Sequence, residues 1–164
     1  MIRLDEQDLK ILLTLQREGR ITKVKLAEAV NLSPSPCWER LKRLEDLGVI
    51  SGYQARINLE TLIKPTLVMT EVTLRHHQHE DFTIFEKAVQ DIPEIVECYA
   101  LGGGVDYMLK ILCRDVDGYQ RLIDRLLVAN IGIDRYFTYI VTKKIKAEPF
   151  PPLENLLDPP VRGK

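Results

Sequence analysis

The chain has 164 residues and nearly balanced charge, with 23 basic and 24 acidic side chains and a formal net charge of −1 at pH 7. This length suits one ordinary domain or two small ones, and the charge excludes a polycation that binds nucleic acid over its whole surface. Cys37, Cys98 and Cys113 form no CxxC pair and are expected to be small buried residues in a reducing cytoplasm. No apolar run approaches the ~20 residues of a membrane span, and the charged N-terminus has no signal-peptide core. We therefore expect a cytoplasmic protein.

The first predicted element is a helix over residues 5–17. Asp5 is suited to cap its N-terminus, leucines 4 and 9 occupy the positions of a hydrophobic staple, and Gly19 is placed to end it. Apolar residues at helical spacing predict one inward face. That face is expected to contain Leu9, Leu12 and Leu13.

A second helix begins after Thr22, which is a good N-cap, and a third follows the short link Asn31-Leu32. Asn31 suits a left-handed turn position. The third helix runs from about Ser35 to Leu47, and Gly48 is placed to end it in a left-handed conformation. Two serines, Ser33 and Ser35, are alternative caps, and two prolines, Pro34 and Pro36, tolerate first-turn positions that need no N–H.

The third helix has one apolar and one polar face. The inward positions are Cys37, Leu41, Leu44 and Gly48, and the outward positions are Ser35, Glu39, Arg40, Lys42 and Arg43. Two short helices of which the second has a basic outer face are typical of the helix-turn-helix motif. An ordinary solvated face gives the same pattern, because acidic residues nearby cancel the basic ones. Periodicity alone therefore leaves both interpretations open.

Five blocks of sequence stand in a fixed order near the N-terminus. They are DEQDLKIL (5–12), GRI (19–21), LA (26–27), LSPSPCWERLKRLE (32–45) and GVISGY (48–53). Their order and spacing resemble the Lrp/AsnC family of bacterial and archaeal transcription regulators, and the resemblance continues to about Lys146. It implies that residues 1–50 form a winged-type helix-turn-helix domain of three helices. The expected DNA contacts are Ser33, Ser35, Pro36, Trp38, Glu39, Arg40, Lys42 and Arg43.

Residues 51–65 are predicted to connect this domain to the rest of the chain. Weak alternation of apolar residues over 49–58 predicts a strand, which in the family helps to join two subunits. Residues 59–65 end in Lys64-Pro65 and are expected to form a hinge. At the other end of the chain, residues 147–164 are rich in proline and are expected to be extended, disordered or laid along the surface.

Residues 66–146 are predicted to form a ferredoxin-like βαββαβ domain, so the fold class is α+β. Strands are expected at 66–75, 94–101, 107–113 and 133–146, and helices at about 80–91 and after Asp115 or Asp117. This order leaves one sheet face bare, which is a natural surface for a partner subunit. The corresponding family module, called RAM, resembles the amino-acid-sensing ACT domain.

A glycine-rich turn precedes the third of these strands, and the candidate effector-binding residues are Gly102, Gly103, Gly104, Asp106 and Tyr107. Glycines allow close approach of a ligand carboxylate to backbone N–H groups, and Asp106 is suited to bind an ammonium group. The alternative is a hairpin turn that needs positive φ, with Asp106 satisfying local backbone. In the family this hairpin lines the effector pocket between dimers. Gly104 stands where an Asp is usual, and Phe137 where an Arg is usual, so the effector's identity stays open.

The sequence contains no catalytic site that we can identify. Apart from Glu80 and Asp81, no Cys, Asp or Glu at metal-binding spacing joins the run His76-His77-Gln78-His79, which is better explained as a solvated loop. We find no catalytic triad, Walker loop or paired-carboxylate site, and we expect no metal and no cofactor.

The sequence therefore predicts a DNA-binding transcription regulator that forms homodimers, assembles further into tetramers or octamers, and responds to an amino-acid-type effector. Two alternatives remain open. One is an amino-acid-sensing module that acts through a protein partner without binding DNA. The other is a small enzyme that uses the glycine turn as an anion site.

Overall fold

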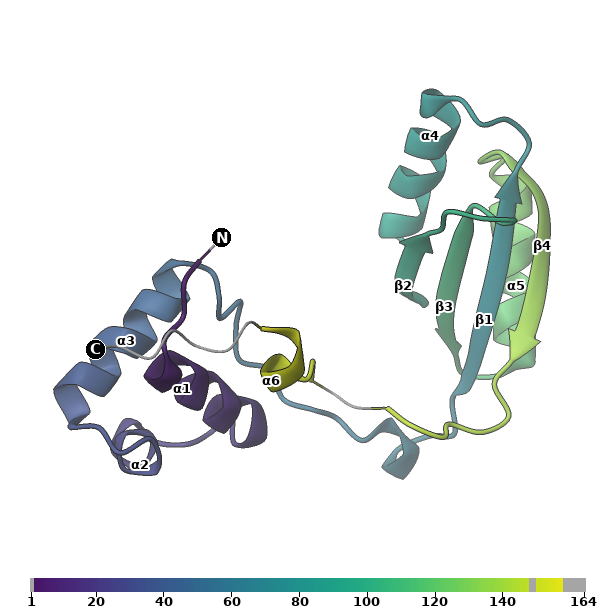
Figure 1. The fold of residues 1–164 in the computed structure, drawn as a ribbon. Coiled ribbons are helices and arrows are strands. Elements are labelled where there is room, and N and C mark those ends of the chain that lie inside the picture. The colour runs from purple at the N-terminus through teal and green to yellow at the C-terminus, as the bar shows by residue number, and fades with distance from the viewer. Residues whose placement is uncertain (1, 148–149, 158–164) are drawn as a thin grey trace. The chain divides into compact units, whose positions relative to one another are not determined.

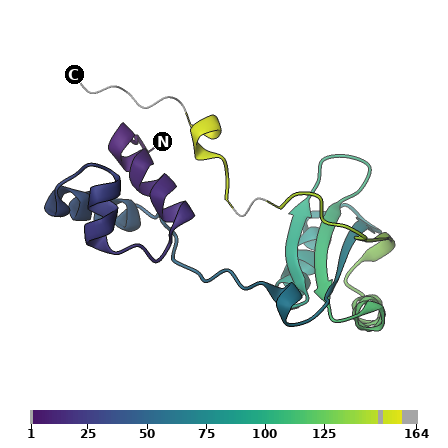
Figure 2. The same ribbon diagram turned by 90° about the horizontal axis from the view of Figure 1, so that it is seen from below.

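The computed structural model describes residues 2–147 and 150–157 (Figure 1). The chain divides into two compact units, one made of Met1–Arg56 with Lys146–Lys164 and the other of Ile57–Ile145. The first is helical, and the second is a four-stranded antiparallel sheet with helices. The predicted α+β class is confirmed. Figure 2 shows the two segments that connect the units, one after α3 and one after β4.

The N-terminal unit contains the three predicted helices, α1 (Glu6–Arg17), α2 (Lys23–Ala29) and α3 (Pro34–Asp46). The carboxylate of Asp5 caps α1 by accepting the N–H groups of residues 7 and 8, each at 2.9 Å, and Thr22 caps α2. Asn31 (φ 56°) and Gly48 (φ 69°) have the left-handed backbone that the sequence predicts after α2 and α3. The described residues of this unit contain no strand.

The inward face of α1 differs from the predicted one. Leu12 is buried as expected, but Leu9 and Leu13 are only half-buried, and Asp8 and Ile11 take their place in the interior. Asp8 lies on the inward face, where its carboxylate forms ion pairs with two arginines of α3. The core of the unit consists of Ile11, Leu12, Leu26, Ala27, Val30, Cys37, Leu41 and Leu44.

The second unit has the predicted βαββαβ order: β1 (Thr66–Leu74), α4 (His79–Gln90), β2 (Ile95–Ala100), β3 (Tyr107–Cys113), α5 (Val116–Val128) and β4 (Ile133–Ile140). The strands lie in the order β2-β3-β1-β4 and all neighbours are antiparallel. Alternate residues of β1 and β3 are buried, and they pack with apolar residues of α4 and α5 in one core.

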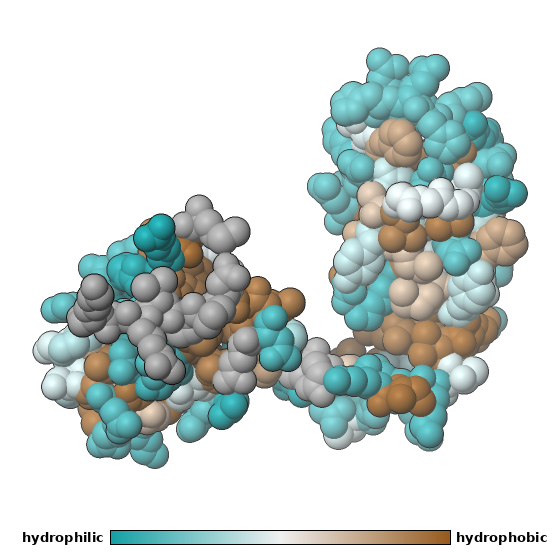
Figure 3. Space-filling model, in the orientation of Figure 1, coloured by the Kyte–Doolittle hydropathy of each residue, from teal (hydrophilic) through white to brown (hydrophobic). Residues whose placement is uncertain are grey.

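Within this unit, no described element covers the opposite face of the sheet. Its aromatic side chains remain about half exposed, with 50% for Tyr99, 52% for Phe137 and 49% for Tyr139. Figure 3 shows apolar surface gathered over the strands. This bare face agrees with the prediction from the order of elements.

Three further details of the prediction are corrected. Strand β4 ends at Ile140, which is paired with Val68 of β1, instead of at 146. Residues 49–58 form no strand, since the N–H groups of Val49 and Ile50 bond back to the Leu44 carbonyl and close α3. Cys98 is exposed, because β2 is an edge strand.

The connecting and terminal segments contain short helices. A 3₁₀ helix at Leu59–Thr61 occupies part of the predicted hinge. In the tail, α6 spans Leu153–Leu156, and Leu153 packs against the core of the N-terminal unit. The expectation for 148–149 and 158–164 lies outside the described residues.

Candidate DNA interface and effector hairpin

The N-terminus of α3 is open to solvent. Ser33 is the N-cap, but its hydroxyl makes no hydrogen bond to the helix backbone, and Pro34 occupies a first-turn position. Ser33, Ser35 and Pro36 are all exposed. The hydroxyls of Ser33 and Ser35 and the backbone N–H of Ser35 are therefore open to an anionic partner, whereas Pro34 and Pro36 carry no N–H.

The predicted outer face of α3 is observed. Cys37, Leu41 and Leu44 are buried, whereas Glu39 and Lys42 are exposed on the other side. Within the described chain, neither Glu39 nor Lys42 has a side-chain hydrogen bond or ion pair. Both side chains are thus available to bind an external partner.

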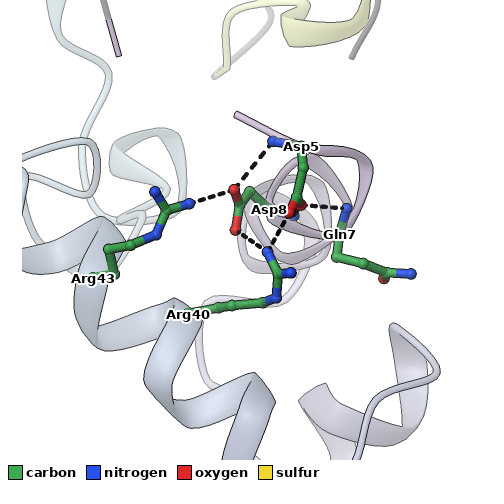
Figure 4. A network of polar contacts seen from close by, with 5 residues as sticks. All are labelled: Asp5, Gln7, Asp8, Arg40 and Arg43. Carbon is green, nitrogen blue, oxygen red and sulfur yellow. Dashed lines mark hydrogen bonds and ion pairs between the residues drawn. The ribbon is translucent and has the colours of Figure 1, made fainter. Parts of the chain in front are cut away.

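The two arginines of this helix are held differently, as Figure 4 shows. One guanidinium nitrogen of Arg40, Nη1, lies 2.6 Å from Asp5 Oδ2 and 2.9 Å from Asp8 Oδ1. The Nη2 atom of Arg43 lies 2.5 Å from Asp8 Oδ2. These ion pairs join the first turn of α1 to the flank of α3, so Arg40 and Arg43 do not project freely into solvent.

Two members of this network, Asp5 and Arg40, have shifted pKa values. Partial burial alone would raise the pKa of Asp5, but the N–H of Asp8 and the guanidinium of Arg40 lower it below its usual value. The hydrogen bond that Arg40 donates to the Asp5 carboxylate raises the pKa of Arg40. Two carboxylates and two guanidinium groups cancel in formal charge, so this flank of α3 carries less positive potential than its sequence suggests.

Sequence reasoning missed Asp8, because a carboxylate near the start of a helix is usually solvated. The spacing Asp5-x-x-Asp8 was the available signal, since it is the spacing of a capping box. That box is present, with each side chain accepting the other residue's N–H.

Trp38 is held by a residue that the sequence did not single out. The ammonium group of Lys23, at the start of α2, lies 3.0 Å from the centre of the Trp38 ring. The ring is still 39% exposed. This cation–π contact connects α2 to α3 and leaves part of the indole surface open.

The glycine turn does not need glycine for its own conformation. Gly102, Gly103 and Gly104 are absent from the described residues with positive φ, and a Cβ added to any of them meets no atom within 4 Å. The interpretation as a turn that requires positive φ is therefore wrong. The space beside these three backbones is open.

Asp106 satisfies local structure, as the alternative interpretation proposed. Its Oδ2 accepts the N–H of Leu74 at 2.8 Å and lies 3.2 Å from the Nε2 atom of His77. The side chain is only 16% exposed. A ligand's ammonium group would have to share this carboxylate with those two partners.

Tyr107 belongs to the core of the second unit. Its ring is 2% exposed and packs 4.5 Å from that of Phe85, and its hydroxyl donates to Glu86. Burial and the Glu86 carboxylate raise its pKa. The structure thus brings together the three glycines and Asp106 at the turn, but it leaves only the backbone of Tyr107 for a ligand.

The structure contains no metal cluster in its described part, where no three or more His, Cys, Asp or Glu side chains gather suitably. His76 and His77 are exposed in the segment between β1 and α4, as predicted, whereas His79, also exposed, is the first residue of α4. Among the described helices, none combines the length and apolar character that crossing a bilayer requires.

Two family models match the chain. A winged helix-turn-helix DNA-binding model covers residues 4–51, and the Lrp/AsnC ligand binding domain covers residues 67–150. The matched relatives are transcriptional regulators, which are not enzymes, so the enzyme alternative is set aside.

Relatives match over most of their length. The transcriptional regulatory protein DoeX of Halomonas elongata is 58% identical and covers 88% of this chain and 92% of its own. The leucine-responsive regulatory protein of Haemophilus influenzae is 42% identical, with coverages of 90% and 89%.

Solved structures agree with these relatives. An AsnC family regulator from Agrobacterium tumefaciens superimposes with a TM-score of 0.87 at 30% identity over 94% of this chain and 100% of its own. A regulator from Neisseria meningitidis, solved in complex with L-methionine, gives 0.86 at 36% identity over 94% and 99%. From its two matched models and these relatives, the chain belongs to the Lrp/AsnC family of DNA-binding transcriptional regulators.

Proposed function

We propose that this protein regulates transcription by sequence-specific binding of α3 in the major groove of DNA. The observation that carries the proposal is the outer face of α3, where Glu39 and Lys42 are exposed without partners in the described chain. Lys42 contacts phosphate, and Arg40 and Arg43 contact base edges or phosphates with the N–H groups that the aspartates leave free. Further contacts near the helix start come from Ser33, Ser35, Pro36, Trp38 and Glu39.

The proposed assembly is a homodimer built on the bare face of the sheet. The half-exposed rings of Tyr99, Phe137 and Tyr139 supply apolar area for such an interface. A two-fold dimer presents two copies of α3 to a near-palindromic site, with half-sites about one duplex turn apart. Dimers assemble further into a tetramer or octamer, and the protein acts in the cytoplasm, where its DNA is.

The proposed effector is an amino-acid-type small molecule bound beside the glycine turn. Three glycines that the turn itself does not require leave room for a ligand against the backbone of Gly102–Gly104. The match to a ligand binding domain and the methionine complex of the Neisseria regulator support this class of ligand. Binding would change assembly or helix spacing, with a coupling free energy of about 1–3 kcal/mol.

The test is selection of duplexes from a random library by the full-length protein, followed by binding isotherms at several salt concentrations. We expect a near-palindromic sequence to be enriched, with affinity that falls steeply with salt because phosphate contacts release counterions. Lys42→Ala should weaken binding and reduce the salt dependence. Lys87→Ala removes the same charge from an exposed site on α4 and serves as the control. Failure to enrich any sequence over scrambled duplex would overturn the proposal.

The effector is tested separately by thermal-shift screening against amino acids and their breakdown products. A compound that raises the Tm should also change affinity for the selected duplex, since linkage is reciprocal. A screen in which no compound moves either quantity would refute an amino-acid-type effector while leaving DNA binding intact.

A further inference from the structure

Asp8 is a buried carboxylate at the junction of α1 and α3. Its side chain is 1% exposed, while those of its partners Arg40 and Arg43 are 31% and 45% exposed. Burying a carboxylate is unfavourable unless charges and hydrogen bonds compensate for the lost water. Here both oxygens are occupied, Oδ1 by Arg40 and Oδ2 by Arg43 and by the N–H of Asp5.

Both arginine side chains remain partly exposed, and the network uses only some of their N–H groups. Each arginine has five N–H donors, and the described ion pairs use only Nη1 of Arg40 and Nη2 of Arg43. The two side chains also line an open surface cavity of about 640 Å³, together with Pro36 and Glu39 at the N-terminal half of α3. The buried anchor therefore lies directly behind groups that we assign to DNA contact.

We propose that Asp8 is a positioning residue for DNA recognition, whose carboxylate orients the guanidinium groups of Arg40 and Arg43 at the surface of α3. This inference rests on the proposed function. Asp8 is itself too buried to touch DNA, so it acts through the arginines. An arginine that reads a base edge must present its planar fork in a fixed orientation, whereas a phosphate contact tolerates many orientations. Asp8 consequently sets sequence selectivity more than total affinity.

The test is the ratio of affinities for the selected duplex and a scrambled duplex of equal length. Asp8→Asn keeps the side chain's shape and one acceptor oxygen but removes the charge that holds both arginines. We expect the ratio to fall about tenfold, since one well-placed arginine–base contact supplies discrimination of that order. Binding to the scrambled duplex should stay equal or tighten, because each chain loses one negative charge.

The control is Glu18→Gln. Glu18 lies at the other end of α1, is exposed, and has no side-chain partner within the described residues. Its substitution changes net charge by the same amount on the same helix, so it should affect both duplexes alike and leave the ratio unchanged. An unchanged ratio in folded, assembled Asp8→Asn protein would overturn the proposal.

A double-mutant cycle with Arg43→Gln shows whether Asp8 acts through this arginine. In the Arg43→Gln background, Asp8→Asn should have less effect on the ratio than it has alone. Equal effects in both backgrounds would contradict action through Arg43.

If Asp8→Asn does not fold, Asp5→Asn replaces it. Asn caps a helix as well as Asp does, and this variant removes only the outer partner of Arg40. A smaller fall in the ratio is expected, and no fall would count against the network's role. Absence of any selected duplex for the unmodified protein would instead refute the proposed function, so the two failures are distinguishable.

Discussion

The outer face of α3 and the glycine turn of the second unit use their polar side chains in opposite ways. On α3, Glu39 and Lys42 have no partners in the described chain and remain exposed. At the turn, Asp106 holds the backbone of Leu74 and Tyr107 is packed in the core. A helix that binds along a DNA groove needs side chains that are not already bonded within the protein. A small-molecule site can be formed largely by backbone, and much of it can come from a neighbouring subunit.

The largest effect on stability should follow from breaking the ion pairs between Asp8 and the arginines of α3. Arg40→Ala leaves the buried carboxylate of Asp8 with one arginine fewer, and we expect the free energy of unfolding to fall by about 2–3 kcal/mol. Urea titration followed by fluorescence of Trp38, the only tryptophan, would measure it. Lys42→Ala, two residues further along α3 at an exposed position, should change this free energy by less than about 0.5 kcal/mol. Equal stabilities for the two variants would show that the network is not stabilising.

Arg43→Ala should act mainly on DNA binding. Arg43 is 45% exposed and gives Asp8 only one of its ion pairs. We expect affinity for the selected duplex to fall by about tenfold, or roughly 1.4 kcal/mol, with the oligomer unchanged by sedimentation. Loss of assembly with unchanged affinity of the remaining oligomer would make Arg43 a structural residue.

A substitution in the glycine turn should leave stability nearly unchanged and should reduce effector binding. Gly103→Ala meets no atom and needs no strained φ, so the free energy of unfolding should change by less than about 0.5 kcal/mol. The thermal shift caused by an effector should nevertheless decrease, because the added methyl group occupies the ligand's space. Gly48→Ala is the contrasting variant, since its φ of 69° should make the substitution unfavourable by about 1 kcal/mol. An undiminished effector response in Gly103→Ala would place the ligand elsewhere.

The smallest effect concerns pH. The pKa of Asp5 is lower in the folded protein than its ordinary value, so its contribution to stability is present above that value and is lost as pH falls through the folded pKa. We expect the free energy of unfolding to decrease below about pH 4, and less steeply in Asp5→Asn. If the free energy of unfolding fell equally steeply with pH in both proteins, Asp5 would not be the source of this pH dependence.

Much of the fold could be predicted because its signals are local. Caps such as Asp5 and Thr22, the left-handed Asn31 and Gly48, and the order of elements in the second unit all follow from short stretches of sequence. The strand predicted over 49–58 was wrong. Weak alternation of apolar residues does not distinguish a strand from a segment whose first N–H groups bond to the end of the preceding helix.

The sites were less predictable because their side chains depend on distant partners. The capping-box spacing of Asp5 and Asp8 indicates a helix start, but it does not indicate that Asp8 will be buried by arginines 32 and 35 residues later. Likewise, periodicity does not distinguish a tyrosine that faces a ligand from Tyr107, whose ring packs on α4. Family membership identifies the module, but not which side chains this chain uses internally.

Solvent access to Trp38 tests most directly whether α3 reads DNA. Its ring is 39% exposed, and it is the only tryptophan of the chain, so acrylamide quenching of its fluorescence reports on this helix alone. We expect the selected duplex to protect Trp38 strongly from quenching, and scrambled duplex at the same concentration and salt to protect it far less. Unchanged quenching at saturating selected duplex would contradict it, because α3 would then lie outside the interface.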